Sequence, residues 1–434
     1  MTNVEIGLAS ILLILVLIQT GMHVSICLMA VSFLGVWLVK GRIAVAGALL
    51  GQAALDSVAR YSFGVIPLFV LMGVLVGVSG MGRDVFDVAG QAFRKVRGGL
   101  GIATVFANAV FAAVNGTSIA SASVFTRIAV PELIRQGYTP RFSVGVVAGS
   151  SVLGMLIPPS LLLILFGILS ESSIGALFTA GILPGILLAL LYALLILGMA
   201  TFAPGFVGRP SNPDLRIMGK GEMATRSLPV LILIAVVLGG IYGGVFTPTE
   251  AGAVGALGAL VIALAKRRLT ARGFWEMLVE TGHVTASITF LIIGAHMYSR
   301  LLALTGLPRA MNGLLEGFNL GLNGVLGLYL VLIVLLGTIL DSASILLILL
   351  PLMLPVIESF GVDMIWFGIV TIIAVEVGLL TPPLGVACFV IKSNLEDRSI
   401  TLGDIFIGAA PFALVMVLAI ALVFAFPWLA TALL

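Results

Sequence analysis

Charged residues are scarce in this sequence. Only 9% of its 434 residues are Asp, Glu, Lys or Arg, whereas 60% are hydrophobic. A soluble chain of this length is about one-quarter charged, and the mean hydropathy of +1.25 lies far on the apolar side. The composition excludes an ordinary soluble protein and predicts an all-α polytopic membrane protein.

Residues that carry enzyme chemistry are equally sparse. The three histidines, His23, His283 and His296, lie in separate segments or too far apart for a metal site. Asp341 has no second deep aspartate with which to form a catalytic dyad. The sequence contains no nucleophile elbow or phosphate loop. We therefore expect a protein that is not an enzyme.

Three further features of the sequence argue against a disulfide, a nucleic-acid partner and a cleavable signal peptide. Cys27 and Cys388 both lie in apolar runs and are expected to be small core residues rather than a disulfide pair. The net charge of +3 is small and the basic residues are scattered, which argues against a nucleic-acid partner. No Lys or Arg precedes the first apolar run, so that run is expected to be a membrane helix and not a cleavable signal peptide.

Apolar runs of roughly seventeen to twenty-five residues predict the membrane spans. A polar loop at 203–226 divides them into two halves. Residues 40–60 and 83–97 are expected to lie in the membrane interface, and 274–280 is amphipathic. At 247–250, Thr-Pro-Thr-Glu predicts a capping box that makes Glu250 structural. The predicted spans are 4–18, 22–39, 63–80, 144–169 and 174–201 in the first half, and 227–246, 251–265, 284–304, 364–395 and 405–429 in the second.

Two long apolar stretches, 100–134 and 322–357, are interrupted by small polar residues. Such breaks favour re-entrant hairpins, whose tips leave helix ends in the protein interior, and for 100–134 the alternative is one long tilted helix. The predicted spans 144–169 and 364–395 each contain a Gly and a Pro pair. Proline has no backbone N–H to donate and interrupts a helix, so both spans are expected to be broken helices. The interruptions are Asn115 to Ser118, Gly337 to Ser344, Gly154 with Pro158 and Pro159, and Gly378 with Pro382 and Pro383.

The two halves repeat each other. The broken spans differ by a constant 224 residues (382 − 158 = 224), and the Pro131-to-Gly137 spacing recurs 224 residues later. The hairpin tips align at an offset of 221 (337 − 116 = 221). Each half then contains three helices, a re-entrant hairpin, a broken helix and a final helix. Five crossings are an odd number, so the second half is inverted, an arrangement typical of secondary transporters.

The distribution of Lys and Arg sets the predicted orientation. One set of loops holds sixteen of the 22 basic residues, and the opposite set holds only Lys40, Arg42, Arg60 and Arg309. The richer set is expected to be cytoplasmic, which places both termini outside. Its members are Arg83, Arg94, Lys95, Arg97, Arg135, Arg141, Arg209, Arg216, Lys220, Arg226, Lys266, Arg267, Arg268, Arg272, Lys392 and Arg398.

Helix ends at the hairpin tips offer free carbonyls that can coordinate a hard cation. Because such positions bind Na⁺ in transporters with broken helices, we expect two or more Na⁺ ions held largely by backbone carbonyls. Close packing of small residues is the structural alternative. The first site would use Gly116, Thr117 and Ser118 with Gly154 and Pro158, and the second Gly337 and Thr338 with Gly378 and Thr381.

Polar side chains near the tips are candidates for substrate binding. Asp341 has no counterpart in the first half, where Ala120 stands, so a role in binding substrate or cation is expected beside the alternative of a helix cap. Glu376 is expected to anchor the unwound segment, and Arg127 either pairs with a substrate carboxylate or extends to the interface. The other candidates are Asn115, Ser118, Ser121, Ser123, Ser150, Ser151, Ser342 and Ser344.

The motifs at 112–118, 128–132, 154–160, 247–251 and 376–385 together resemble the large membrane subunit of tripartite ATP-independent periplasmic (TRAP) transporters. The resemblance covers essentially the whole chain, although the family's Ser-Gly-Ser tip is here Asn115-Gly116-Thr117. It implies Na⁺-coupled import of a small organic acid across the bacterial inner membrane. It also implies a separate small four-helix membrane subunit and a periplasmic substrate-binding protein.

The resemblance further implies an elevator-type fold, in which a transport domain moves against a static scaffold. On that basis residues 1–97 are scaffold helices and interfacial arms, and 98–202 form half of the transport domain. Residues 203–321 are the central loop and further scaffold helices, and 322–434 form the other half. Dicarboxylates and sialic acid-like acids are both open as substrates.

Two other functions are open at this stage. The same fold without partners would be a stand-alone sodium–dicarboxylate-type symporter. A membrane scaffold protein would carry out no transport. Uptake by this chain in proteoliposomes, with and without a binding protein, distinguishes these possibilities.

Overall fold

The computed structural model describes residues 2–209, 218–317 and 320–434, so Arg216 of the predicted cytoplasmic set lies outside the described residues. In these ranges every regular element is helical, apart from an isolated bridge between Tyr138 and Gly208. Length and composition identify seven candidate membrane spans there, or eight if one bent pair is counted as a span. The predicted all-α polytopic fold is confirmed.

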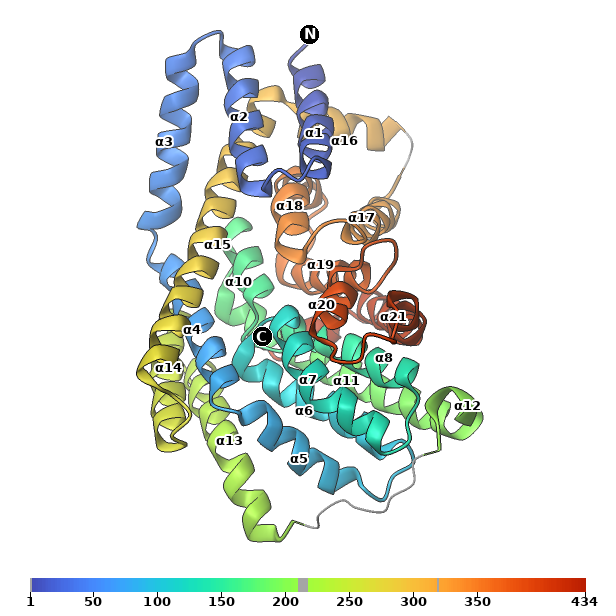
Figure 1. Ribbon diagram of the computed structural model, residues 1–434. Helices are drawn as coiled ribbons and strands as arrows, with labels where there is room; N and C mark the ends of the chain where they lie inside the picture. The colour runs from blue at the N-terminus through green and yellow to red at the C-terminus, as the bar shows by residue number, and fades with distance from the viewer. Residues whose placement is uncertain (1, 210–217, 318–319) are drawn as a thin grey trace.

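In the described residues, the helices that precede each hairpin follow the predicted repeat, with five in the first half and four in the second, where one long helix takes the place of two. Residues 43–59 plus 224 give 267–283, which falls largely in the first part of α15 (Ala271–Thr305), and α4 (Val65–Val78) corresponds to its second part. Figure 1 shows α15 along one side of the molecule beside α3 and α4. These helices are α1 (Asn3–Gln19), α2 (Val24–Lys40), α3 (Ile43–Ala59), α4 (Val65–Val78) and α5 (Met81–Phe93), then α13 (Lys220–Tyr242), α14 (Pro248–Ala265), α15 (Ala271–Thr305) and α16 (Leu307–Gly317).

Two boundaries differ from the sequence prediction. The amphipathic segment at 274–280 and the span at 284–304 are one continuous helix of 35 residues, α15. In the first half the chain instead turns out of helix at Arg60, between α3 and α4. Residues 43–59 pack as a full helix on α2 and α15, and their depth in a membrane stays a prediction. The capping box at Thr247 and Glu250 is confirmed.

The two hairpins break where the sequence predicts. Helix α6 (Gly99–Asn115) ends at Gly116 and α7 (Ser118–Arg135) begins after an extended Thr117, while α17 (Leu322–Gly337) and α18 (Ser342–Ser359) flank the second tip. Helix α18 is long enough to cross a bilayer, but 72% of it is buried in protein. The other single-helix candidates are 17–44% buried, so α18 is an internal arm rather than a lipid-facing span.

The broken helices face these tips. The first bends by 40° between its two parts, and each contains a cis Pro–Pro bond, at Pro158–Pro159 and Pro382–Pro383. The first consists of α8 (Pro140–Ser151), α9 (Leu153–Leu156) and α10 (Leu161–Leu169), and the second of α19 (Met364–Leu379) and α20 (Val386–Asn394). The final helices are α11 (Ile174–Phe202) and α21 (Leu402–Ala425), each followed by a short helix, α12 (Pro204–Val207) and α22 (Trp428–Thr431).

The halves interlock through these elements. A Cβ atom on Gly145 of α8 would lie 2.2 Å from the carbonyl oxygen of Gly408 on α21, so only glycines permit this helix crossing. Tyr192 of α11 packs edge-on against Phe412 of α21, with ring centroids 5.3 Å apart. The broken helix of one half is therefore held by the final helix of the other, which brings both tips to one place.

Candidate functional site

The first tip is fastened to the unwound segment opposite it. The Leu161 amide donates to the Gly116 carbonyl at 3.0 Å. Gly116 has a left-handed backbone (φ 72°), and a Cβ there would lie 2.7 Å from the Pro159 carbonyl oxygen. A Cβ on Gly154 would lie 2.6 Å from the Thr117 carbonyl oxygen. Both glycines are required because backbone meets backbone here.

The second tip repeats this contact with different residues. The amides of Leu384 and Gly385 donate to the Thr338 carbonyl at 3.0 and 3.3 Å. Gly337 and Gly378 touch directly: a Cβ on Gly337 would lie 2.7 Å from the Cα of Gly378. Each tip is therefore joined to its broken helix by glycine contact and backbone hydrogen bonds.

These contacts bring together the residues within each of the two predicted cation-binding sets. Gly116, Thr117 and Ser118 meet Gly154 and the segment of Pro158, and Gly337 and Thr338 meet Gly378 and the loop after Thr381. Carbonyl oxygens have two lone pairs, so one hydrogen bond leaves acceptor capacity. Within the described ranges no cluster of three His, Cys, Asp or Glu side chains could hold a metal. Cation binding at the tips would rely on backbone and hydroxyl oxygens and stays a prediction.

A cavity of about 730 Å³ lies between the tips and the helices α4 and α15. Asn115, Thr117, Ser123, Asp341 and Ser342 line it from the hairpins. The opposite wall carries three polar residues of α15 that are not among the predicted site residues, Glu280, His283 and Ser287. The amphipathic character of 274–280 signals Glu280 in the sequence, and no pattern there signals His283 or Ser287.

Asp341 combines both roles that the sequence left open. It is the N-cap of α18, where one carboxylate oxygen accepts from the Ser344 amide at 3.2 Å and the other from the Ser344 hydroxyl. It also lines the cavity. Asn115 lines the same cavity while its side-chain amide donates to the Thr117 carbonyl at 3.1 Å, so it shapes the tip itself.

The other substrate candidates do not line this cavity. Ser150 accepts from Asn108 at 2.6 Å, and Ser151 donates to the Ala148 carbonyl at 2.8 Å. Arg127 donates to Asn394 Oδ1 at 2.6 Å, and its pairing with a substrate carboxylate stays a prediction. The remaining three are buried in the hairpins: Ser118 and Ser121, and Ser344, which is bound to Asp341.

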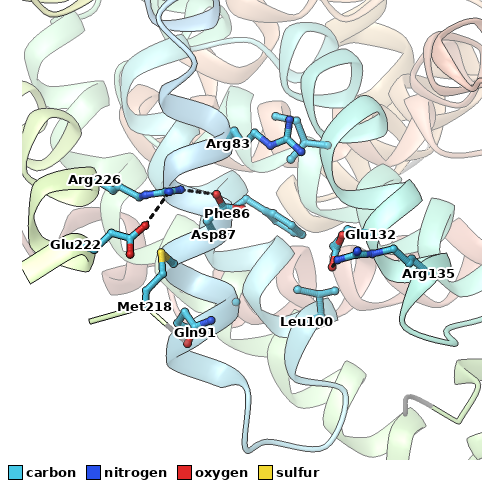
Figure 2. Close-up of a pocket in the computed structure, with 12 residues that line it drawn as sticks. Arg83, Phe86, Asp87, Gln91, Leu100, Glu132, Arg135, Met218, Glu222 and Arg226 are labelled. Carbon is cyan, nitrogen blue, oxygen red and sulfur yellow. Dashed lines mark hydrogen bonds and ion pairs between the residues drawn. The ribbon is translucent and has the colours of Figure 1, made fainter. Parts of the chain in front are cut away.

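A second, smaller pocket of about 280 Å³ lies among α5, α7 and α13 (Figure 2). Arg226 of α13 pairs with Asp87 of α5 at 2.7 Å and with Glu222 at 2.9 Å. Burial raises the pKa of Asp87, against the opposing effect of Arg226 and Arg83. Lys266, the C-cap residue of α14, pairs with Asp84 in the same group. These ion pairs tie α5 to α13 and α14.

Comparison with known proteins agrees with this architecture. Residues 11–429 match the family described as tripartite ATP-independent periplasmic transporter, DctM component. The chain is 33% identical over 377 residues to the C4-dicarboxylate TRAP transporter large permease protein DctM of Pseudomonas aeruginosa, covering 86% of each chain. It is 30% identical to the sialic acid TRAP transporter large permease protein SiaM of Vibrio cholerae, covering 87% of each.

The 2,3-diketo-L-gulonate TRAP transporter large permease protein YiaN of Escherichia coli is 28% identical, with 85% of each chain covered. Among solved structures, the YdaH transporter of Alcanivorax borkumensis shares the fold, with a TM-score of 0.62 at 14% identity over 89% of this chain and 90% of that one. The repeat, the paired tips and these matches agree: the chain is a multi-pass membrane protein that belongs to the DctM component family of the TRAP transporters.

Proposed function

We propose that this protein imports a small organic acid and is driven by Na⁺. The observation that carries the proposal is one cavity between two glycine-packed hairpin tips, with Asp341 and Ser342 among the polar residues in its wall, in a chain of the DctM family. The relatives are named for C4-dicarboxylates, sialic acid and diketogulonate, all of which are organic acids. A carboxylate substrate also suits the N-terminal ends of α7 and α18, because helix N-termini attract anions.

The position of the cavity supports the proposal that this is the inward-open state of an elevator-type transporter. It reaches Gly77 and Val78 at the end of α4 and Glu280 in the first part of α15. Both positions lie next to loops in the predicted cytoplasmic set. In the proposed cycle the hairpins and broken helices move together against α4 and α15, carrying substrate between the two sides of the inner membrane.

The proposal includes two partners and an orientation. A periplasmic substrate-binding protein delivers the acid, and a small four-helix membrane subunit completes the scaffold. Both termini face the periplasm. The outer helix α3 is a suitable contact for the small subunit because it exposes Ile43, Leu55 and Val58, with Leu55 68% exposed.

Reconstitution tests the proposal. Purified chain is placed in proteoliposomes alone, with the small subunit, and with both the small subunit and the binding protein. We expect uptake of a labelled organic acid only in the complete system, and only with an inward Na⁺ gradient rather than a K⁺ or choline gradient. Uptake by the chain alone would support the stand-alone symporter, and no uptake in any combination would support a scaffold.

A further inference from the structure

Glu376 lies where the two hairpins meet, although it belongs to neither of them. It is a residue of α19 and is only 1% exposed. Its Oε1 accepts from the hydroxyl of Ser342, the first residue of α18, at 2.9 Å. The hydroxyl of Ser118, the first residue of α7, interacts with the same carboxyl. One side chain thus joins the inner arms of both hairpins.

The carboxyl is incompletely satisfied. In the described part of the chain, Glu376 Oε2 and the Ser118 hydroxyl are buried without a hydrogen bond of ordinary geometry. The hydroxyl of Tyr192 on α11, near enough to interact electrostatically with Glu376, is also buried without a partner. No Lys, Arg or His of the described residues forms an ion pair with Glu376.

A buried carboxylate without a cationic side chain needs other compensation. Two helix N-termini face Glu376, since Ser118 and Ser342 open α7 and α18, and each contributes a partial positive charge. A bound cation would supply the rest. Ser118 belongs to the first predicted cation set, and Gly378 of the second set lies two residues after Glu376 in the same helix.

We propose that Glu376 is a positioning residue for cation binding, which supplies a carboxylate shared by both cation sites when cations are bound and links the two tips through Ser118 and Ser342. This inference rests on the proposed Na⁺ coupling. It assigns Glu376 a role beyond the anchoring of its own unwound segment. The first half has Val152 at the corresponding position (376 − 224 = 152), so a single carboxylate serves both repeats.

The test is the substitution Glu376→Gln, which keeps the shape and removes the charge. We expect the Na⁺ concentration for half-maximal uptake to rise by about tenfold or more, because a nearby opposite charge is lost. We also expect the detergent-solubilised variant to lose the increase in melting temperature that Na⁺, compared with choline, gives the original protein. A merely structural residue would not change the Na⁺ dependence selectively.

Glu250→Gln is the matched control, because Glu250 caps α14 at an exposed position outside the tips. Its Na⁺ dependence should not change. If Glu376→Gln does not fold, Ser342→Ala removes the donor to Oε1 and should raise the half-saturating Na⁺ concentration about fivefold. Unchanged Na⁺ dependence in a folded variant overturns the inference. Absence of Na⁺ dependence in the original protein instead rejects the proposed function.

Discussion

At both hairpin tips a carbonyl of the tip accepts from the unwound segment that faces it, Gly116 from Leu161 and Thr338 from Leu384. Both contacts need glycine, because backbone lies against backbone. The side chains beside them differ. The first tip carries Asn115, whose amide donates to its own tip, whereas the second carries Asp341, which caps α18 and faces the cavity.

This difference indicates that the backbone contacts and the side chains at the tips serve separate functions. The backbone contact is repeated in both halves, which suits a function common to them, such as holding two similar cations. The side chains are not repeated, which suits recognition of one asymmetric substrate. Substitutions at the shared contact should therefore disable the protein altogether, and substitutions of unshared side chains should change binding while the fold persists.

The largest effect is expected from Gly337→Val, which breaks the shared contact. The added Cβ would lie 2.7 Å from the Cα of Gly378, and that backbone has no flexible end that could move aside. Overpacking of this kind costs about 1–3 kcal/mol or more, so we expect Na⁺-driven uptake to fall by about a hundredfold. Gly116→Val should do the same at the first tip, since it also meets backbone and has a left-handed φ.

Gly327→Val is the control for this experiment. Gly327 lies in α17, and a Cβ there would meet no atom within 4 Å. Uptake by this variant should match that of the original protein, with equal elution from a sizing column. If Gly337→Val transports normally, the glycine contact is not needed for function.

The second largest effect is expected from Asp341→Asn, which removes the charge that distinguishes the second tip. Asn is as good an N-cap as Asp, so the helix should persist. Hydrogen bonds to charged groups contribute about 1.5–3 kcal/mol, so we expect uptake to fall by about tenfold or more at an unchanged melting temperature. Asp363→Asn is the control, because Asp363 caps α19 at an exposed position away from the cavity. Equal activity of both variants would remove Asp341 from the binding site.

The sequence predicted the parts of the site that depend on backbone geometry. Gly116, Gly154, Gly337 and Gly378 stand where no side chain fits. Because only glycine fits at such a backbone contact, the requirement can be recognised in the sequence as matching Gly and Pro positions in the two halves. The same reasoning located both hairpin breaks, because a polar Gly-containing island cannot continue an apolar helix without cost.

The sequence predicted hairpin side chains that reach the cavity, such as Asp341 and Ser342, but not the side chains that reach it from α15. Glu280 and His283 face it because α15 continues without a break from its amphipathic start, whereas the equivalent chain turns at Arg60. That difference depends on packing against α2 and α3, which no local pattern encodes. The hydroxyl of Ser150 accepts from Asn108, 42 residues away in sequence, and no local pattern predicts that contact.

The smallest effect is expected from Arg127→Gln, which tests whether a basic residue of the first hairpin belongs to the site at all. Arg127 is exposed and donates through two nitrogens to Asn394 Oδ1 of α20. Since an exposed contact of this kind contributes about 0–1 kcal/mol to stability, the half-saturating substrate concentration should change less than about twofold. Asn394→Ala removes the partner and should give the same small change. A large rise in that concentration for Arg127→Gln but not for Asn394→Ala would mean that the guanidinium leaves Asn394 to bind substrate during the transport cycle.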